Sequence, residues 1–206
     1  MSLMHSLKPV LCLGSVSPRR RELLTQIGVP FVVVGPHIDE TVRTGESPQQ
    51  YVTRLAQEKA LAIRRNGQQL PVLAADTTVV VDGQIFGKPR DKAEGVYMLG
   101  VLSGRTHEVL TAIALADSRG VAARLNSSTV RFRAISREES LAYWETGEPC
   151  DKAGGYGIQG FGAVFIESLT GSHSGVMGLP LFETGELLRE AGIPYWDGGA
   201  RSRGQV

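Results

Sequence analysis

The sequence predicts an α/β fold built on a mixed sheet. Apolar runs of strand length alternate with segments that carry helix-start signals and a helical spacing of apolar residues. The longest apolar run ends in Asp82-Gly83, a hairpin signal, so the strands are not all parallel. The chain has 206 residues, of which 42% are hydrophobic, and this length is enough for one sizeable core. We expect a single domain over residues 1–196, with two lobes around a cleft, and a disordered polar tail over residues 197–206.

The first strand and the first helix come from one continuous stretch. Residues 11–14 form a short apolar run that is typical of a buried strand. Ser17 is a natural N-cap residue, and Pro18 suits the first helical position, where no amide hydrogen is needed. Gly28 then closes the helix.

Arg19, Arg20 and Arg21 stand in the first turn of this helix, against the positive end of its dipole. Each such cation costs about 0.3–1 kcal/mol where it cannot move away. A bound anion reverses that sign, because free amides and guanidinium groups both stabilise phosphate. One arginine would simply extend into solvent, but three of them after a strand-Gly-Ser turn favour an anion site.

The second helix follows a short strand at Phe31 to Val34 and a polar loop that carries Asp39 and Glu40. Ser47-Pro48-Gln49-Gln50 predicts a capping box, and the helix extends to about Arg65. Lys59 falls on its apolar stripe. Either Lys59 extends outward to solvent, or it points into a cleft that holds negative charge.

Asp76 lies in the middle of the longest apolar run, residues 70–81. A buried carboxylate is costly unless it is paired, hydrogen-bonded or bound to a metal. Backbone amides could satisfy it, or it could be a metal ligand or general base. We favour a function, because its neighbours in the strand are small or β-branched and offer no partner. Lys88 follows on a constrained loop between Gly87 and Pro89, which suits a ligand contact.

The second half of the chain continues the alternation. Expected in order are a capping box at Asp91-Lys92-Ala93-Glu94 with a helix to about Leu102, strands at His107 to Leu115 and Ser127 to Ile135, a helix capped by Ser136, a strand at Ala163 to Ile166, a Gly-rich loop at Gly171 to Gly178 and a last helix from Leu181. Residues 151–162 are rich in glycine but carry apolar residues, which predicts a packed loop. Its Gln159 offers a donor and an acceptor side by side, as the imide edge of a pyrimidine requires.

Charge and cysteine content narrow the class of protein. Lys plus Arg number 22 and Asp plus Glu 21, giving a net charge of +1. This balance argues against the strongly positive overall charge of a nucleic-acid-binding protein, so any anion-binding site must be formed by a local group of cations. The two cysteines, Cys12 and Cys150, form no disulfide framework or zinc pattern. No signal peptide or membrane span is recognisable, so a cytoplasmic protein with no membrane partner is expected.

Eight short pieces stand in a fixed order between residue 10 and about residue 192. They are Ser15-Val16-Ser17-Pro18-Arg19-Arg20, Gln57-Glu58-Lys59-Ala60, Ala75-Asp76-Thr77, Gly87-Lys88-Pro89-Arg90, Ser103-Gly104, Asp151-Lys152-Ala153-Gly154, Gly157-Ile158-Gln159-Gly160 and Gly178-Leu179-Pro180. This series resembles the Maf family of nucleoside triphosphate pyrophosphatases, with small departures at Val16 and Arg21.

The resemblance implies an elongated α/β fold with a mixed sheet and a central cleft, related to the inosine triphosphatases. It also implies hydrolysis between the α and β phosphates, with a divalent cation, Mg²⁺ or Mn²⁺, and a homodimer. Asp76 looks like the catalytic carboxylate and a metal ligand, and Glu40 like an acidic helper near the metal, although Asp39 is an alternative. The residues expected to bind substrate are Ser15, Arg19, Arg20, Lys59, Thr77, Lys88 and Gln159.

Arg19, Thr77 and Gln159 stand at positions that separate subgroups of the family. The subgroup that acts on dTTP and UTP has these three residue types, whereas the 7-methyl-GTP subgroup has an aromatic residue, a Gln and a Glu. The expected reaction is therefore hydrolysis of dTTP or UTP, or of modified pyrimidine nucleotides, to the monophosphate and pyrophosphate. The alternatives are a nucleotide-binding regulator of cell division without turnover, and a 7-methyl-GTP pyrophosphatase.

Overall fold

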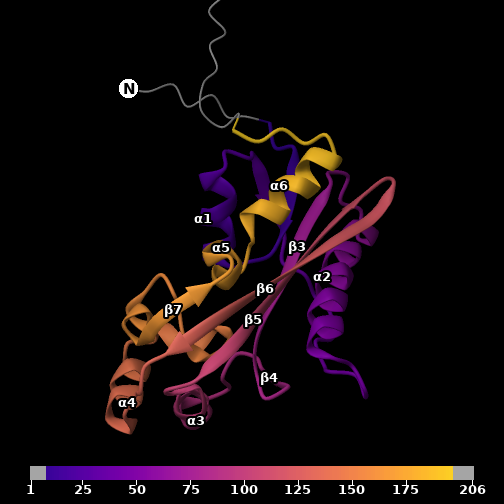
Figure 1. Cartoon of the computed structure of the whole chain (residues 1–206). Coiled ribbons are helices and arrows are strands. Elements are labelled where there is room, and N and C mark those ends of the chain that lie inside the picture. Colours follow the sequence, from indigo (N-terminus) through magenta and orange to yellow (C-terminus); the bar gives the residue numbers. More distant parts are fainter. Residues whose placement is uncertain (1–7, 197–206) are drawn as a thin grey trace, which may run out of the picture.

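The computed structural model describes residues 8–196 and confirms the α/β fold with a mixed sheet (Figure 1). Six of the seven strands follow the order β2-β1-β3-β5-β6-β7, and the seventh, β4, pairs with β3 off this path. The strands are β1 (Leu11–Gly14), β2 (Phe31–Val33), β3 (Val72–Val81), β4 (Gln84–Phe86), β5 (Thr106–Asp117), β6 (Gly120–Phe132) and β7 (Ile166–Thr170). β1 is parallel to β2 and β3, and the other pairings are antiparallel. The tail predicted over residues 197–206 lies outside the described residues.

The helices begin largely where the capping signals predict them. They are α1 (Pro18–Gln26), α2 (Pro48–Arg65), α3 (Lys92–Leu102), α4 (Arg137–Glu145), α5 (His173–Met177) and α6 (Leu181–Glu190), with 3₁₀ turns η1 (Glu148–Asp151), η2 (Ala153–Gly155) and η3 (Phe161–Phe165). Ser47 and Ser136 each form a complete capping box. The capping box at Asp91 is only half formed, because the Glu94 carboxylate accepts the amide of Arg90 instead. Within residues 8–196, no helix is long and apolar enough to cross a bilayer.

The two-residue alternation of β3 sends its side chains to two separate cores. Leu73 and Ala75 pack on the side of α1 and α6, whereas Val72 and Ala74 pack against α2 on the opposite face. A third core joins Val79 and neighbouring strand residues to α3 and α4, at the far end of the sheet in Figure 1. The long strands β3, β5 and β6 therefore connect two packed regions.

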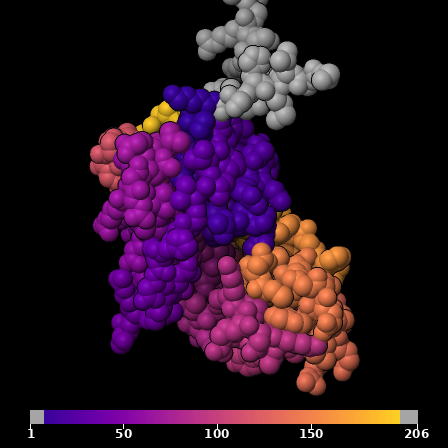
Figure 2. Space-filling model, turned by 180° about the vertical axis from the view of Figure 1, so that it is seen from behind, coloured from indigo at the N-terminus to yellow at the C-terminus, as the bar shows by residue number. Residues whose placement is uncertain are grey.

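One edge of β3 is open in its middle. β1 pairs with β3 only as far as Ala74, and β4 joins the same edge only from Val79 onward. On its other side, β3 pairs with β5 without interruption from Val72 to Val80. Among the described strands, none pairs with the free edge at residues 75–78, and the surface is hollowed where the N-terminal, magenta and orange segments meet (Figure 2).

Three predictions in the second half were wrong in detail. Residues 163–165 lie in η3, and the strand begins only at Ile166, because a short apolar run does not distinguish a strand from a helical turn by periodicity. The segment at residues 171–178, predicted as a loop, contains helix α5. β6 begins at Gly120 and ends at Phe132 rather than spanning Ser127 to Ile135, because pairing with β5 orders its largely exposed first half.

Candidate active site

A cleft of about 520 Å³ opens at the free edge of β3. Its volume falls within the range of small-molecule sites, roughly 300–1,000 Å³. Its walls are the β1–α1 turn, α2, β3, the loop after β4 and the end of α5, together with residues 151–162, called here the Gly-rich segment. The predicted site residues all line it: Ser15, Arg19, Arg20, Glu40, Lys59, Asp76, Thr77, Lys88 and Gln159.

Asp76 and Lys59 form an ion pair at the base of this cleft. Asp76 continues the face of β3 that packs against α2, and Lys59 lies on the buried stripe of α2. Lys59 Nζ donates to Asp76 Oδ1 at 2.6 Å, and the two side chains are only 8% and 10% exposed. Lys59 therefore points inward, toward negative charge, and Asp76 is held by an ammonium group rather than by backbone amides.

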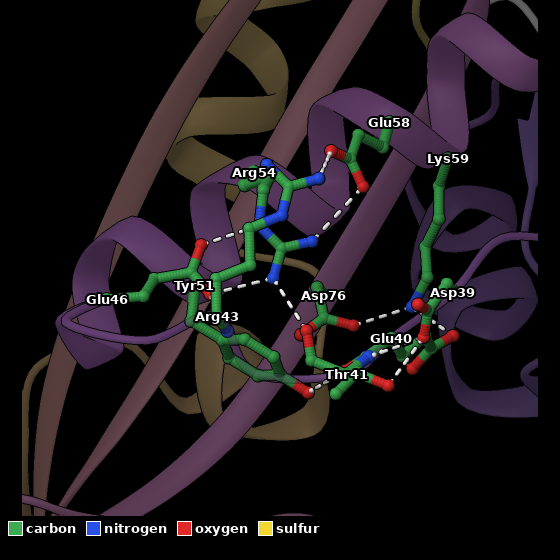
Figure 3. Close-up of polar contacts among 10 residues, drawn as sticks. All are labelled: Asp39, Glu40, Thr41, Arg43, Glu46, Tyr51, Arg54, Glu58, Lys59 and Asp76. Carbon is green, nitrogen blue, oxygen red and sulfur yellow. Dashed lines mark hydrogen bonds and ion pairs between the residues drawn. The ribbon is translucent and has the colours of Figure 1, made fainter.

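Burial raises the pKa of Asp76, and the neighbouring Lys59 ammonium opposes that shift. Lys59 Nζ also contacts Glu40 Oε1 at 2.9 Å, so one cation lies between two carboxylates. Asp39 instead accepts the amide and hydroxyl of Thr41 in a local turn, which lowers its pKa. Of the two acidic residues that the sequence left as alternatives, Glu40 is the one that contacts Lys59 (Figure 3).

Arg20 is held by protein groups on the opposite face of β3. Its guanidinium donates to Ser15 Oγ at 3.2 Å, to Thr77 Oγ1 at 3.1 Å and to the Gly178 carbonyl at 2.8 Å. Thr77 is in turn 3.0 Å from Thr111 Oγ1. Removal from solvent lowers the pKa of Arg20, but a guanidinium remains charged in proteins. Arg20 thus fixes the β1–α1 turn and supplies positive charge to the wall of the cleft.

Arg19 and Lys88 are the more accessible cations of the site. Arg19 Nη1 pairs with Asp151 Oδ2 at 2.9 Å and so links α1 to η1. Lys88 is exposed on the loop before Pro89. The sequence did not single out Lys152, which lines the cleft and donates to Asp151 Oδ1 at 2.7 Å. Arg21 is exposed and does not line the cleft, so only two of the three arginines belong to the site.

The Gly-rich segment is packed, as predicted, and Glu148 is the residue that holds it. The Glu148 carboxylate accepts the amides of Phe161 at 2.8 Å and Gly162 at 3.0 Å, and the hydroxyl of Tyr143 at 2.6 Å. A Cβ on Gly160 would lie 2.0 Å from Glu148, so glycine is needed there. Gln159 is exposed to the cleft on this fixed segment. Glu148 carried no sequence signal of its own, because its contacts to the Gly-rich segment are with backbone amides.

The donor set suits a divalent cation that is shared with a substrate. The described residues contain no cluster of three or more histidine, cysteine or acidic side chains that would form a complete metal cage. Asp76 and Glu40 nevertheless come from two different segments and both contact Lys59 Nζ, so the two carboxylates lie close to each other at the cleft. Mg²⁺ commonly binds through one or two carboxylates together with substrate phosphates, so the pair fits such an ion.

Comparison with known proteins extends over nearly the whole chain. A family described as Maf-like protein matches residues 10–191. Proteins named dTTP/UTP pyrophosphatase are 52% identical in Saccharophagus degradans (90% of this chain and 90% of that protein), 53% in Alkalilimnicola ehrlichii (91% and 96%) and 54% in Methylobacillus flagellatus (88% and 92%). The solved structure of the Staphylococcus aureus Ham1 protein aligns with a TM-score of 0.44 and 16% identity, over 76% of this chain and 79% of that one.

Proposed function

The chain belongs to the family of Maf-like proteins, and from that premise we propose that it is a pyrophosphatase that hydrolyses dTTP and UTP to the monophosphate and pyrophosphate. Relatives that share 52–54% of its residues over about nine-tenths of the chain carry that name. The observation that carries the proposal is the cleft itself. One buried carboxylate, Asp76, lies there among cations from separate segments of the chain.

The cations suit a triphosphate. Arg19, Lys59 and Lys88 come from α1, α2 and the loop after β4, and all line the same cleft. Pre-positioned positive charge stabilises the charge that develops on phosphate oxygens during phosphoryl transfer. In this reaction the oxygen of water forms a bond to the α-phosphorus, and the bond from that phosphorus to the bridging oxygen of pyrophosphate breaks.

Asp76 is proposed to act on the attacking water. Its carboxylate accepts a hydrogen bond from that water and orients it, while Lys59 keeps the carboxylate in place. Asp76 and Glu40 would hold a divalent cation, Mg²⁺ or Mn²⁺, which supplies charge neutralisation at the phosphates. On this assignment Arg20 and Ser15 shape the phosphate pocket, since each already contacts the other.

Gln159 would recognise the pyrimidine base of the nucleotide. Its amide has one donor and one acceptor side by side, which complements the imide edge of uracil or thymine. The Glu148 contacts keep this segment in one conformation, so the amide is presented to the base without a large ordering cost. We further propose a homodimer that acts in the cytoplasm on free nucleotides rather than on nucleic acid.

The test measures pyrophosphate release from dTTP, UTP, CTP, GTP and 7-methyl-GTP in the presence of Mg²⁺. We expect dTTP and UTP to be the preferred substrates. Asp76→Asn should lower kcat by about 10²–10⁴-fold, the usual contribution of a positioned acid or base. Asp76→Asn with full turnover would refute the role of Asp76. Nucleotide binding without pyrophosphate release would favour a non-catalytic regulator, and preference for 7-methyl-GTP would assign the chain to another substrate class.

A further inference from the structure

Arg54 lies on α2 above the acidic loop, residues 39–46, that carries Glu40 (Figure 3). Its guanidinium binds Glu46 at two points, with Nε 2.5 Å from Oε1 and Nη2 2.7 Å from Oε2. The Arg54 and Glu46 side chains are only 12% and 9% exposed. A two-point contact of this kind fixes orientation as well as distance, so the end of the loop is anchored on α2.

The same guanidinium also holds the backbone next to Glu40. Arg54 Nη2 donates to the Thr41 carbonyl at 3.1 Å. The guanidinium lies over the ring of Tyr51, 5.7 Å from the ring centre, and the Tyr51 hydroxyl donates to the Glu40 carbonyl at 3.1 Å. Two consecutive carbonyls, those of Glu40 and Thr41, are therefore fixed from α2.

Glu40 needs this support, because its own side chain is 55% exposed. The contact with the Lys59 ammonium holds Glu40 only weakly by itself, since the long and solvent-exposed Glu40 side chain must be ordered to make it. Fixing the backbone carbonyls of Glu40 and of the residue that follows it reduces the cost of ordering this side chain. Arg54 does not line the cleft, so it acts on the site through the loop.

We propose that Arg54 is a positioning residue that holds Glu40 against Lys59 and Asp76 by fixing residues 39–46 on α2 through Glu46 and Thr41. The effect on catalysis rests on the proposed function, whereas the effect on the loop does not. Lysine cannot replace Arg54, because an ammonium group has no planar fork with which to bind Glu46 at two points.

Steady-state kinetics with dTTP and Mg²⁺ test the catalytic part. Arg54→Met and Arg54→Lys should each lower kcat by about 10–100-fold, as is typical when a group that orients a metal ligand is removed, with KM for dTTP within about twofold. In a Glu40→Gln background, Arg54→Met should cause no further loss. Arg65→Met is the matched control, because it removes an exposed cation from the same helix and leaves the Arg54–Glu46 and Arg43–Glu58 contacts intact.

Hydrogen–deuterium exchange provides a readout that is independent of turnover. Amides of residues 39–46 should exchange faster in Arg54→Met and remain protected in Arg65→Met. Should Arg54→Met not fold, Glu46→Gln weakens the same contact from the other side, and the same pattern is expected. A loss of kcat that is equally large in the Glu40→Gln background, or unchanged exchange of the loop, would overturn the proposal. A wild-type protein without turnover refutes the proposed function but leaves the exchange result decisive for Arg54.

Discussion

His107 is a buried histidine directly behind the cleft. Its Nε2 lies 2.8 Å from the hydroxyl of Tyr156, which lines the cleft, and its ring packs edge-to-face on Phe132. Its Nδ1 is buried without a partner among the residues described. Burial lowers the pKa of His107 from 6.5 to about 4, because the charged imidazolium has no compensating group there.

This histidine should make the protein less stable in mild acid. Because its pKa is about 4 when folded and 6.5 when unfolded, the unfolded chain takes up the proton first as the pH falls. Between pH 7 and pH 5 the free energy of unfolding should drop by about 2 kcal/mol from this group alone. Urea unfolding at both pH values, in the wild type and in His107→Gln, measures it. An equal drop in the variant would exclude His107 as the cause.

The contact between Lys59 and Asp76 was within reach of the sequence. Asp76 shares its strand face with Val72 and Ala74, and Lys59 shares the stripe of Val52, so both point to the interface of α2 and β3. Glu40 was only partly predictable. Its position depends on an irregular loop, whose anchor, Arg54, reads in the sequence as an ordinary solvent-exposed helix residue.

Helix α3 offers two glycines with opposite roles. A Cβ on Gly95 would lie 2.3 Å from the ring of Trp144 in α4, whereas a Cβ on Gly100 would meet nothing within 4 Å. Gly95 thus permits α3 and α4 to approach closely, whereas no neighbouring group among the described residues requires a glycine at position 100.

Gly100→Ala should therefore stabilise the protein by about 0.5–1 kcal/mol, because alanine loses less backbone entropy in a helix. Gly95→Ala should destabilise it by about 1–2 kcal/mol, since the cost of overpacking exceeds the same gain. Chemical denaturation of both variants gives the two free energies of unfolding. If both changes shifted stability in the same direction, the contact with Trp144 would not limit this position.

The elements that the sequence placed correctly are those with local signals. Ser47 and Ser136 each carry a capping box, and Gly147 ends α4 in a left-handed conformation. β7 had no such signal, because its order comes from pairing with β6. α5 does have an N-cap at Ser172 and a left-handed glycine at Gly178, but five residues are too few to show a helical pattern, and distant contacts also hold its start. Ser172, for example, donates its amide to Ser128 of β6 at 2.9 Å.

The two packed regions of the molecule are joined by the long strands and, across the cleft, by the Arg19–Asp151 pair. Asp151 is 54% exposed, so this pair adds little stability by itself. A nucleotide that touches both walls would add a far stronger connection.

A non-hydrolysable α,β-methylene analogue of UTP should therefore stabilise the whole chain against urea. At 100 times its Kd the gain should be about 2.7 kcal/mol, as binding to the folded state alone requires. Arg19→Met should require a higher concentration for the same gain, whereas Arg21→Met, which changes an exposed residue outside the cleft, should not. An identical titration curve for Arg19→Met and the wild type would show that Arg19 takes no part in binding.

The overall arrangement could be predicted only in part. Alternating strands and helices with a hairpin indicated a mixed sheet, and the order of the eight short pieces indicated a cleft through the family resemblance. The missing neighbour along residues 75–78 of β3 could not be inferred, because it depends on where β1 leaves the sheet and where β4 joins it.

Because none of the described strands pairs with residues 75–78 on this edge, the residues that hold the sheet together are different from those that line the cleft. β3 pairs with β5 from Val72 to Val80. Substitutions in exposed segments around the cleft therefore leave the hydrogen bonds of the sheet in place. Libraries that vary Gln159 while sparing Gly160, Glu148 and the ladder to β5 would then yield many folded members with altered nucleotide preferences.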